Sequence, residues 1–215
     1  MVRQISTIGI VFILTLCSAA VAQDTKRGFQ EIRRFTAREA RQGIAVDDRY
    51  FYAITDRAIG KYDKRSGEVV QTWEGPADGP IIHLDSGVVL DGLLYCAHSN
   101  YPGVPMVSSI EIWDTRTLEH VGSHSVGIFA GSATWIDRWD GYWWIAFANY
   151  AGSGGEPGKG PEWTTLVKFH NDWHQVGGYI YPPAVVERFG TMGNSGGTWG
   201  EGGRLYITGH NNAEI

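Results

Sequence analysis

The stretch "VVLDGLLYCAHSN" (88–100) decides the fold, because it consists of two apolar runs joined by an Asp-Gly pair. Asp-Gly accepts the positive φ angles of a tight turn, so the pattern predicts a β-hairpin. Its second run is centred on an aromatic residue, Tyr95. Three other stretches repeat this shape: "GIAVDDRYFYAIT" (43–55) around Tyr52, "SATWIDRWDGYWWIAFAN" (132–149) around Trp144 with a longer turn, and "GGTWGEGGRLYITGHNN" (196–212) around Tyr206.

A second hairpin follows the first in three of the four units. These hairpins are "IGKYDKRSGEVVQTW" (59–73), "IEIWDTRTLEHVGSH" (110–124) and "LVKFHNDWHQVGGYI" (166–180). Units of four antiparallel strands at intervals of roughly 40 to 60 residues are typical of a β-propeller. A β-sandwich, the main alternative, would not repeat one hairpin four times. We therefore expect an all-β protein with the propeller fold.

The number of repeated units is too small for a closed propeller ring. The chain stops at Glu214-Ile215, where the third strand of the fourth unit is expected. About three and a half blades do not close a ring of typically four to eight. We therefore expect a propeller domain over residues 23–215 that is incomplete at its C-terminus. The alternating segment "GFQEIRRF" (28–35) is expected to supply the outer strand of the last blade.

The first 22 residues read as a secretory signal peptide. Arg3 precedes an apolar run from Ile8 to Leu16, and Ala20-Val21-Ala22 gives a small-x-small cleavage pattern. Leu16 stands directly before Cys17, where a lipoprotein signal needs a small residue. The sequence therefore predicts an exported protein, periplasmic or extracellular.

Composition excludes several classes of protein. The formal net charge is −5, and it becomes more negative without the signal peptide, so non-specific nucleic-acid binding is not expected. No stretch beyond the signal peptide is apolar enough to span a membrane. Cys96 is the one cysteine after the signal peptide, so the fold rests on its core and not on a disulfide. Nine Trp, ten Tyr and eight Phe supply that core.

The predicted functional region is the rim of the central channel, where the loops after the second strand of each blade meet. Equivalent positions in successive units carry polar and aromatic side chains. The candidate ligand-binding residues are His98, Asn100, Tyr101, Asn149, Tyr150, His210 and Asn211, with Asp56 as the equivalent in the first unit. Residues just before each first strand are expected to join them: Gln42, His83, Asp85, Ser132, Asn194 and Ser195.

These residue types allow more than one chemistry. Amide and carboxylate oxygens from several blades suit Ca²⁺, and inclusion of His98 or His210 suits Zn²⁺ or Mn²⁺. Without a metal, the same groups would orient a polar ligand over Trp135 and Trp199. The structural alternative is that Asn recurs only because it tolerates tight turns and bonds its own backbone. The Gly-rich insertion "ANYAGSGGEPGKGPEW" (148–163) is expected to form a flap on the rim.

A family resemblance accompanies these patterns. The repeated hairpins resemble the six-bladed propellers of the gluconolactonase/senescence-marker and NHL-repeat class. The runs "HSNYPGVPMVSSIEIWD" (98–114) and "FANYAGSGGEPGKGPEWTTLVKF" (147–169) also look like a group of uncharacterised bacterial exported propeller proteins. The lactonase resemblance implies a divalent metal at the channel mouth, with Asn149 and Asn211 as amide ligands and Asp85 as an acidic one. Gln42 stands near the place of that family's metal-binding Glu.

Two functions remain open from the sequence. The first is an exported propeller that binds a small ligand or a protein partner through its polar rim. The alternative is a metal-dependent hydrolase, similar to a lactonase or esterase, that acts on a small polar substrate. In that case the metal would polarise a carbonyl group and activate water, and Asp85 or Asp56 would serve as base.

Overall fold

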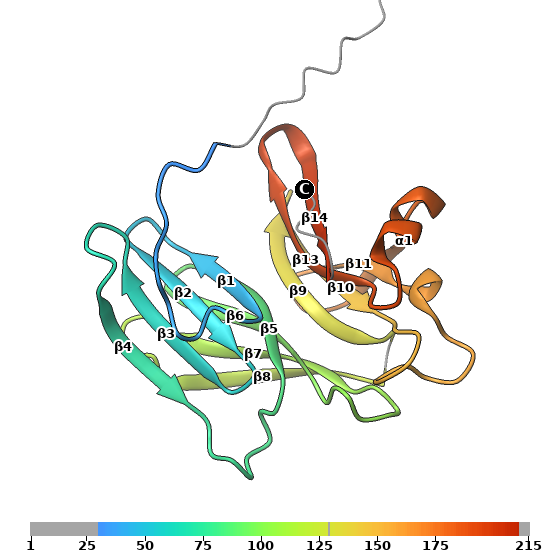
Figure 1. The fold of residues 1–215 in the computed structure, drawn as a ribbon, viewed down its shortest axis with the longest axis horizontal. Coiled ribbons are helices and arrows are strands. Elements are labelled where there is room, and N and C mark those ends of the chain that lie inside the picture. Colours follow the sequence, from blue (N-terminus) through green and yellow to red (C-terminus); the bar gives the residue numbers. More distant parts are fainter. Residues whose placement is uncertain (1–29, 129, 211–215) are drawn as a thin grey trace, which may run out of the picture. The chain divides into compact units, whose positions relative to one another are not determined.

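The computed structural model describes residues 30–128 and 130–210 (Figure 1). The chain divides into two units, residues 1–34 and 35–215. In the described part of the first unit, Arg34 and Glu31 form an exposed ion pair at 2.7 Å. The predicted signal peptide and Asn211 lie outside the described residues.

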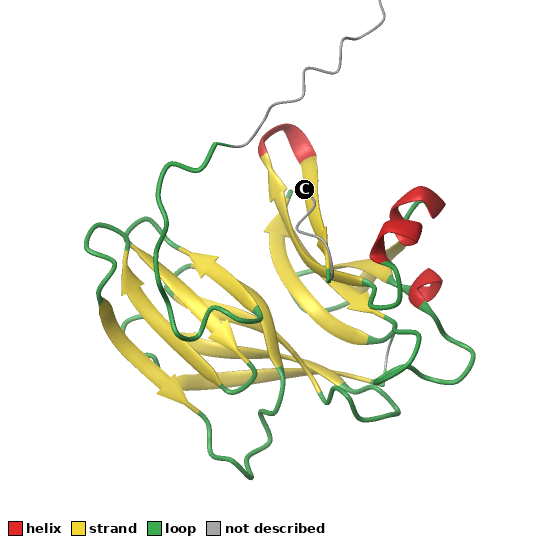
Figure 2. Cartoon of the chain, in the orientation of Figure 1, coloured by secondary structure: helices red, strands yellow, loops and turns green. Residues whose placement is uncertain are grey.

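The described part of residues 35–215 is built from antiparallel sheets, and strands that neighbour each other in sequence pair with each other (Figure 2). The first sheet contains β1 (Gly43–Val46), β2 (Tyr50–Thr55), β3 (Ala58–Asp63) and β4 (Val69–Glu74). The second contains β5 (Leu84–Leu90), β6 (Leu93–Ser99), β7 (Ser108–Asp114) and β8 (His120–Gly127). The third contains β9 (Ser132–Trp139), β10 (Tyr142–Ala148), β11 (Thr165–Phe169) and β12 (Gln175–Ile180). A fourth sheet of two strands, β13 (Asn194–Gly200) and β14 (Arg204–Gly209), follows.

The repeat expected from the sequence is confirmed strand by strand. Each aromatic anchor is the third residue of the second strand of its sheet: Tyr52 in β2, Tyr95 in β6, Trp144 in β10 and Tyr206 in β14. Each of the first three sheets has the four antiparallel strands that the paired hairpins predict.

Two hairpins have the Asp-Gly turns that the sequence suggests. One of these turns, before Trp144, is shorter than expected. Asp91-Gly92 joins β5 to β6 with φ angles of 50° and 77°. Asp140-Gly141 joins β9 to β10 with the same two values, so the turn around Trp144 is not longer than the others. The additional residues of that unit belong to β9, which extends to Trp139. Asp and Gly are the residues that tolerate this left-handed geometry.

The first strands of consecutive sheets lie against each other: β1 contacts β5, β5 contacts β9, and β9 contacts β13. The approach is close, since a Cβ atom on Gly43 would lie 2.5 Å from the Cα atom of Ser86. Apolar side chains fill the space between sheets, and Trp113 of β7 is fully buried in a cluster that includes Tyr52 and Ile59 of the first sheet. Stability therefore comes from sheet faces packed on each other.

Residues 30–35 form no strand here, and the prediction that they supply the outer strand of a blade absent from this chain stays a prediction. A strand needs a neighbour to receive its backbone hydrogen bonds, and Phe35 instead packs on Phe51 of β2 with ring centroids 4.9 Å apart.

The connection from β12 to β13 contains a helix that the sequence analysis did not expect. This helix, α1 (Pro183–Phe189), begins with a proline in its first turn and ends before Gly190. Phe189 is buried in a cluster with Trp135, Trp144 and Tyr181. The other helical segments are the single 3-10 turns η1 (Pro161–Trp163) and η2 (Glu201–Gly203).

Two tryptophans expected as walls of the channel belong to this core. Trp135 is fully buried, and its Nε1 atom donates a hydrogen bond to Asn194. Trp199 stacks on Trp139 with ring centroids 5.1 Å apart. Aromatic packing between the third and fourth sheets thus accounts for both side chains.

Candidate functional site

The candidate site is centred on His83, in the loop that precedes β5. Two backbone hydrogen bonds fix this loop. The amide of Leu84 donates to the carbonyl oxygen of Asp56 at 2.8 Å, and the amide of Ser99 donates to the carbonyl oxygen of His83 at 3.1 Å. Since Asp56 lies in the β2–β3 turn and Ser99 ends β6, the bonds bring loops of the first and second sheets together.

The imidazole ring of His83 lies between two carboxyl groups. Its Nδ1 atom is 3.0 Å from Oδ1 of Asp56, and its Nε2 atom is 3.5 Å from Oδ2 of Asp85. Asp85 is 2% exposed, whereas Asp56 reaches solvent and accepts a hydrogen bond from the Gln42 side chain at 2.7 Å. We call Asp56, His83 and Asp85 the acid–imidazole line.

Aromatic rings from three further loops extend away from this line. The ring of Tyr101 lies 4.9 Å from that of His83, Tyr150 lies 5.2 Å from Tyr101, and His210 lies 6.4 Å from Tyr150. Tyr101 follows β6 and Tyr150 follows β10 at equivalent positions of the repeat, whereas His210 directly follows β14, two positions before the equivalent place in the fourth unit. The structure therefore brings three of the predicted rim residues together; we call Tyr101, Tyr150 and His210 the aromatic row.

Hydroxyl groups connect the second and third sheets below the aromatic row. Ser132, the first residue of β9, donates to Oγ of Ser99 at 2.8 Å, and the same oxygen accepts a hydrogen bond from the amide of Tyr101 at 3.3 Å. Ser132 also forms a hydrogen bond with the Tyr150 side chain. These bonds hold both tyrosines on rigid strand ends.

Burial determines the protonation of the site. It raises the pKa of Asp85 well above the ordinary value, and the negative charge of Asp56 raises it further. It lowers the pKa of His83; Asp56 opposes this change and His210 adds to it. Burial also lowers the pKa of His210 and raises that of the Tyr150 phenol. Both imidazoles and the buried carboxyl group are therefore biased toward their neutral forms.

The side chain of Asn100 bonds within its own loop, whereas that of Asn149 bonds both its own loop and the β8–β9 loop. Asn100 donates to the carbonyl oxygen of Pro105 at 3.0 Å and accepts from the amide of Val107 at 2.7 Å. Asn149 donates to the carbonyl oxygen of Trp163 at 3.1 Å and to that of Ala130. The structural alternative, in which Asn bonds its own backbone turn, accounts for the contacts within each loop, and ligand binding by Asn100 and Asn149 stays a prediction.

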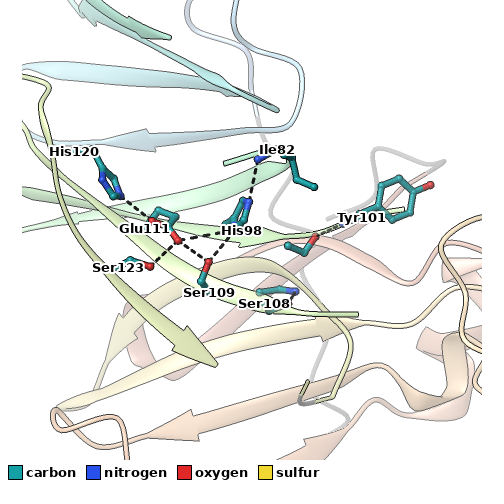
Figure 3. Close-up of polar contacts among 10 residues, drawn as sticks. Ile82, His98, Tyr101, Ser108, Ser109, Glu111, His120 and Ser123 are labelled. Carbon is teal, nitrogen blue, oxygen red and sulfur yellow. Dashed lines mark hydrogen bonds and ion pairs between the residues drawn. The ribbon is translucent and has the colours of Figure 1, made fainter. Parts of the chain in front are cut away.

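His98 is directed toward a buried polar network and not toward the aromatic row (Figure 3). Its Nε2 atom accepts a hydrogen bond from the amide of Ile82 at 3.1 Å, and its Nδ1 atom is 2.8 Å from Oγ of Ser109. Both ring nitrogens therefore have protein partners. This arrangement gives His98 structural contacts, and ligand binding by His98 stays a prediction.

Glu111 is the centre of the same network (Figure 3). Its carboxylate accepts hydrogen bonds from Ser109 at 2.6 Å, from Ser123 at 2.8 Å and from Nε2 of His120 at 2.7 Å. Burial alone would raise the pKa of Glu111, but these donors hold it below its usual value. A carboxylate with three donors is a satisfied buried charge.

The Gly-rich insertion packs beside the aromatic row. Gly154 has a φ of +75°, and a Cβ atom there would lie 2.3 Å from the ring of Tyr101. Glu156 accepts a hydrogen bond from the amide of Met106 at 2.9 Å and pairs with Lys159 at 2.6 Å. A depression of about 460 Å³ adjoins Tyr150 and is lined by residues of this loop. The insertion is thus held against the β6–β7 loop, next to the site.

The geometry bears on the metal prediction. Within residues 30–128 and 130–210, no three His, Cys, Asp or Glu side chains are grouped so that they could hold a metal ion. Asp56 and Asp85 lie at opposite nitrogens of His83, so the ring separates the two carboxyl groups. The predicted Ca²⁺ or Zn²⁺ site at Asp85, Asn149 and Asn211 stays a prediction, because Asn211 lies outside the described residues.

The sequence analysis named Asp56, Gln42, His83 and Ser132 as rim residues but gave the asparagines the main part in ligand binding. The signal that identifies His83 is its position directly before a first strand, with acidic residues at the start of that strand and in the preceding sheet's loop.

No helix in the described part of the chain is long and apolar enough to cross a membrane.

Comparisons with known proteins give limited likeness. No protein-family model matches the chain, and no curated protein does so either. A crystal structure of a protein of unknown function from Bacteroides caccae matches with 10% identity and a TM-score of 0.47, over 77% of this chain and 52% of that one. The structure of U3-55K matches with 11% identity and a TM-score of 0.44, over 69% of this chain and 41% of that one. The chain thus spans about half the length of these structures or less.

Proposed function

We propose that the chain is a β-propeller protein that binds a small polar ligand where the acid–imidazole line meets the aromatic row. The sheets would be successive blades, because first strands β1, β5, β9 and β13 contact each other in order and the aromatic anchors recur at one strand position. In such a ring, the loops after each second strand open onto one face. Action outside the cytoplasm is part of this proposal and is supported by the sequence of residues 1–22.

The observation that carries the proposal is the environment of Asp85. This carboxyl group is 2% exposed, and its described polar partner is Nε2 of His83 at 3.5 Å, which is long for a hydrogen bond. Burial of a poorly satisfied carboxyl group destabilises a fold. Such groups are common at binding and catalytic sites, where a ligand completes their hydrogen bonds. The nearby aromatic rings offer the apolar walls that ligand sites need.

Chemical-shift perturbation in NMR spectra of the full chain tests the proposal. The probes are ethanolamine, glucose, sodium acetate and calcium chloride, each added separately. At least one probe is expected to shift the resonances of His83, Tyr101 and Tyr150, and this response is expected to be lost in Tyr101→Leu and Tyr150→Leu. Val121→Ala, an exposed position on β8, is the control and should respond as the wild type does. Absence of any response, or an unchanged response in both tyrosine variants, would overturn the proposal.

A further inference from the structure

We infer that the ligand of this site is an organic ammonium ion, bound to the carboxylate of Asp85 and against the rings of Tyr101 and Tyr150. The inference rests on the proposed function and adds the chemical class of the ligand. It depends on the charge of the site, on the burial of Asp85 and on the orientation of the rings.

The charge of the described site is negative. The exposed carboxyl group of Asp56 contributes the negative charge, Asp85 is a second acid that can ionise when a cation lies beside it, and burial biases the imidazoles of His83 and His210 toward their neutral forms. The guanidinium group of Arg57, which follows Asp56 in sequence, donates to the carbonyl oxygen of Ala77 at 2.6 Å and is held by that contact. A cation is therefore the ligand that the electrostatic potential of the site favours.

The burial of Asp85 leads to the same class of ligand. Burial raises the pKa of Asp85 because water no longer stabilises the charge of its carboxylate. It ionises readily only when a positive group lies beside it. An ammonium group supplies both the charge and hydrogen-bond donors for the oxygens of Asp85. A neutral polyol would supply donors but would leave the charge of Asp85 uncompensated.

The aromatic rings fit an ammonium ion. The planes of Tyr101 and Tyr150 are inclined by 72° with centroids 5.2 Å apart, so the two rings pack edge to face and not as a parallel stack. A cation over an aromatic face is attracted by the ring, and the contact is strongest when the cation is desolvated.

A divalent metal ion fits less well. Calcium takes six to eight oxygen ligands at short distances, and here the ring of His83 separates the carboxyl groups of Asp56 and Asp85. An ammonium ion needs only one of these carboxylates.

Binding is accompanied by a balanced proton transfer. When the free site holds Asp85 as a carboxylic acid, an ammonium ion enters, the O–H bond of Asp85 breaks, and the proton leaves to solvent. The bound state then contains the carboxylate and the cation. Affinity is therefore expected to rise with pH over the range in which Asp85 of the free protein is protonated.

Titration calorimetry of the full chain with matched probes tests this inference. The probes are ethanolamine, choline and 3,3-dimethylbutan-1-ol, the last of which is an uncharged isostere of choline. We expect an ammonium probe to bind at least about tenfold more tightly than the alcohol, the size of effect that a desolvated cation–aromatic contact gives. Measurements in buffers of different ionisation enthalpy are expected to show proton release on binding.

Variants separate charge from shape. Asp85→Asn is expected to remove the preference for the ammonium probe and the proton release on binding. Asp78→Asn, exposed in the β4–β5 loop, is the control for a lost negative charge.

Equal binding of choline and its isostere, or unchanged binding in Asp85→Asn, would overturn the inference. Binding of none of the three probes at millimolar concentration would do so as well. If glucose or acetate still perturbs the resonances of Tyr101 and Tyr150, only the ammonium inference fails and the proposed function is retained. If no probe perturbs them, the proposed function fails as well.

Discussion

The backbone amide of Ile82 donates a hydrogen bond to Nε2 of His98 at 3.1 Å, and this bond connects the buried network of the second sheet to the residue before His83. Because Nε2 accepts, the ring proton of neutral His98 belongs on Nδ1, where it donates to Ser109. Protonation of His98 would place two N–H groups face to face and break the bond to Ile82.

His98 is therefore expected to reduce stability in acid. Burial lowers its pKa, Glu111 opposes the change and His83 adds to it. The unfolded chain, with a pKa near about 6.5, then binds more protons than the folded one. Stability should fall as pH drops below that value. In His98→Gln the amide oxygen can still accept from Ile82, so the variant should lose less stability between pH 7 and pH 5 in urea unfolding. A stability difference that does not change with pH would contradict this.

Glu111→Gln is expected to destabilise the protein by about 1–3 kcal/mol, the cost of leaving a buried polar group unsatisfied. Glu111 is 6% exposed and accepts from three donors, so an amide in its place would direct N–H groups at some of them. Denaturant unfolding measures the change. Glu119→Gln, exposed in the following turn, is the matched control and should change stability by less than about 0.5 kcal/mol. Equal effects of the two variants would show that the network contributes little.

The fold could be predicted largely from the sequence because its signals are local. Asp91-Gly92 and Asp140-Gly141 specify their turns, and alternation in the flanking runs sets the strands. Helix α1 was missed because it is short and contains adjacent valines, which favour strands. A segment of this length carries too few residues for a clear helical period.

The site was less predictable because it depends on contacts between loops of different sheets. Asp56 and His83 meet through the bond from Leu84 to Asp56, which no sequence pattern reports. The asparagines illustrate a different difficulty. Asn100 has the residue type and spacing of a ligand, yet its amide bridges its own loop. Turn formation and ligand binding use the same side-chain groups, and only the geometry distinguishes them.

Gly154→Ala is expected to disturb the contact between the Gly-rich insertion and the site. The φ of +75° disfavours any side chain, and the added methyl group would overlap the Tyr101 ring. Gly158→Ala is a close control, because Gly158 has a φ of +80° with nothing within 4 Å of the added atom. Both variants should lose about 1 kcal/mol from backbone strain. Gly154→Ala should lose more and shift the ring resonances of Tyr101, whereas equal losses would show that the packing against Tyr101 is not important.

Asp85→Asn is expected to stabilise the ligand-free protein at neutral pH. Burial, and then the charge of Asp56, raise the pKa of Asp85 in the folded state above the unfolded value of about 3.9. The folded protein therefore binds more protons than the unfolded chain between these two pKa values, and the wild type loses stability as pH rises through that window. Each unit of difference corresponds to about 1.4 kcal/mol. The variant has no proton to lose, so its advantage in urea unfolding should grow from pH 4 upward and level off above the folded-state pKa. Asp78→Asn should show no such growth. An advantage that is constant with pH, or that shrinks as pH rises, would mean that Asp85 is stabilised as a carboxylate in the free protein.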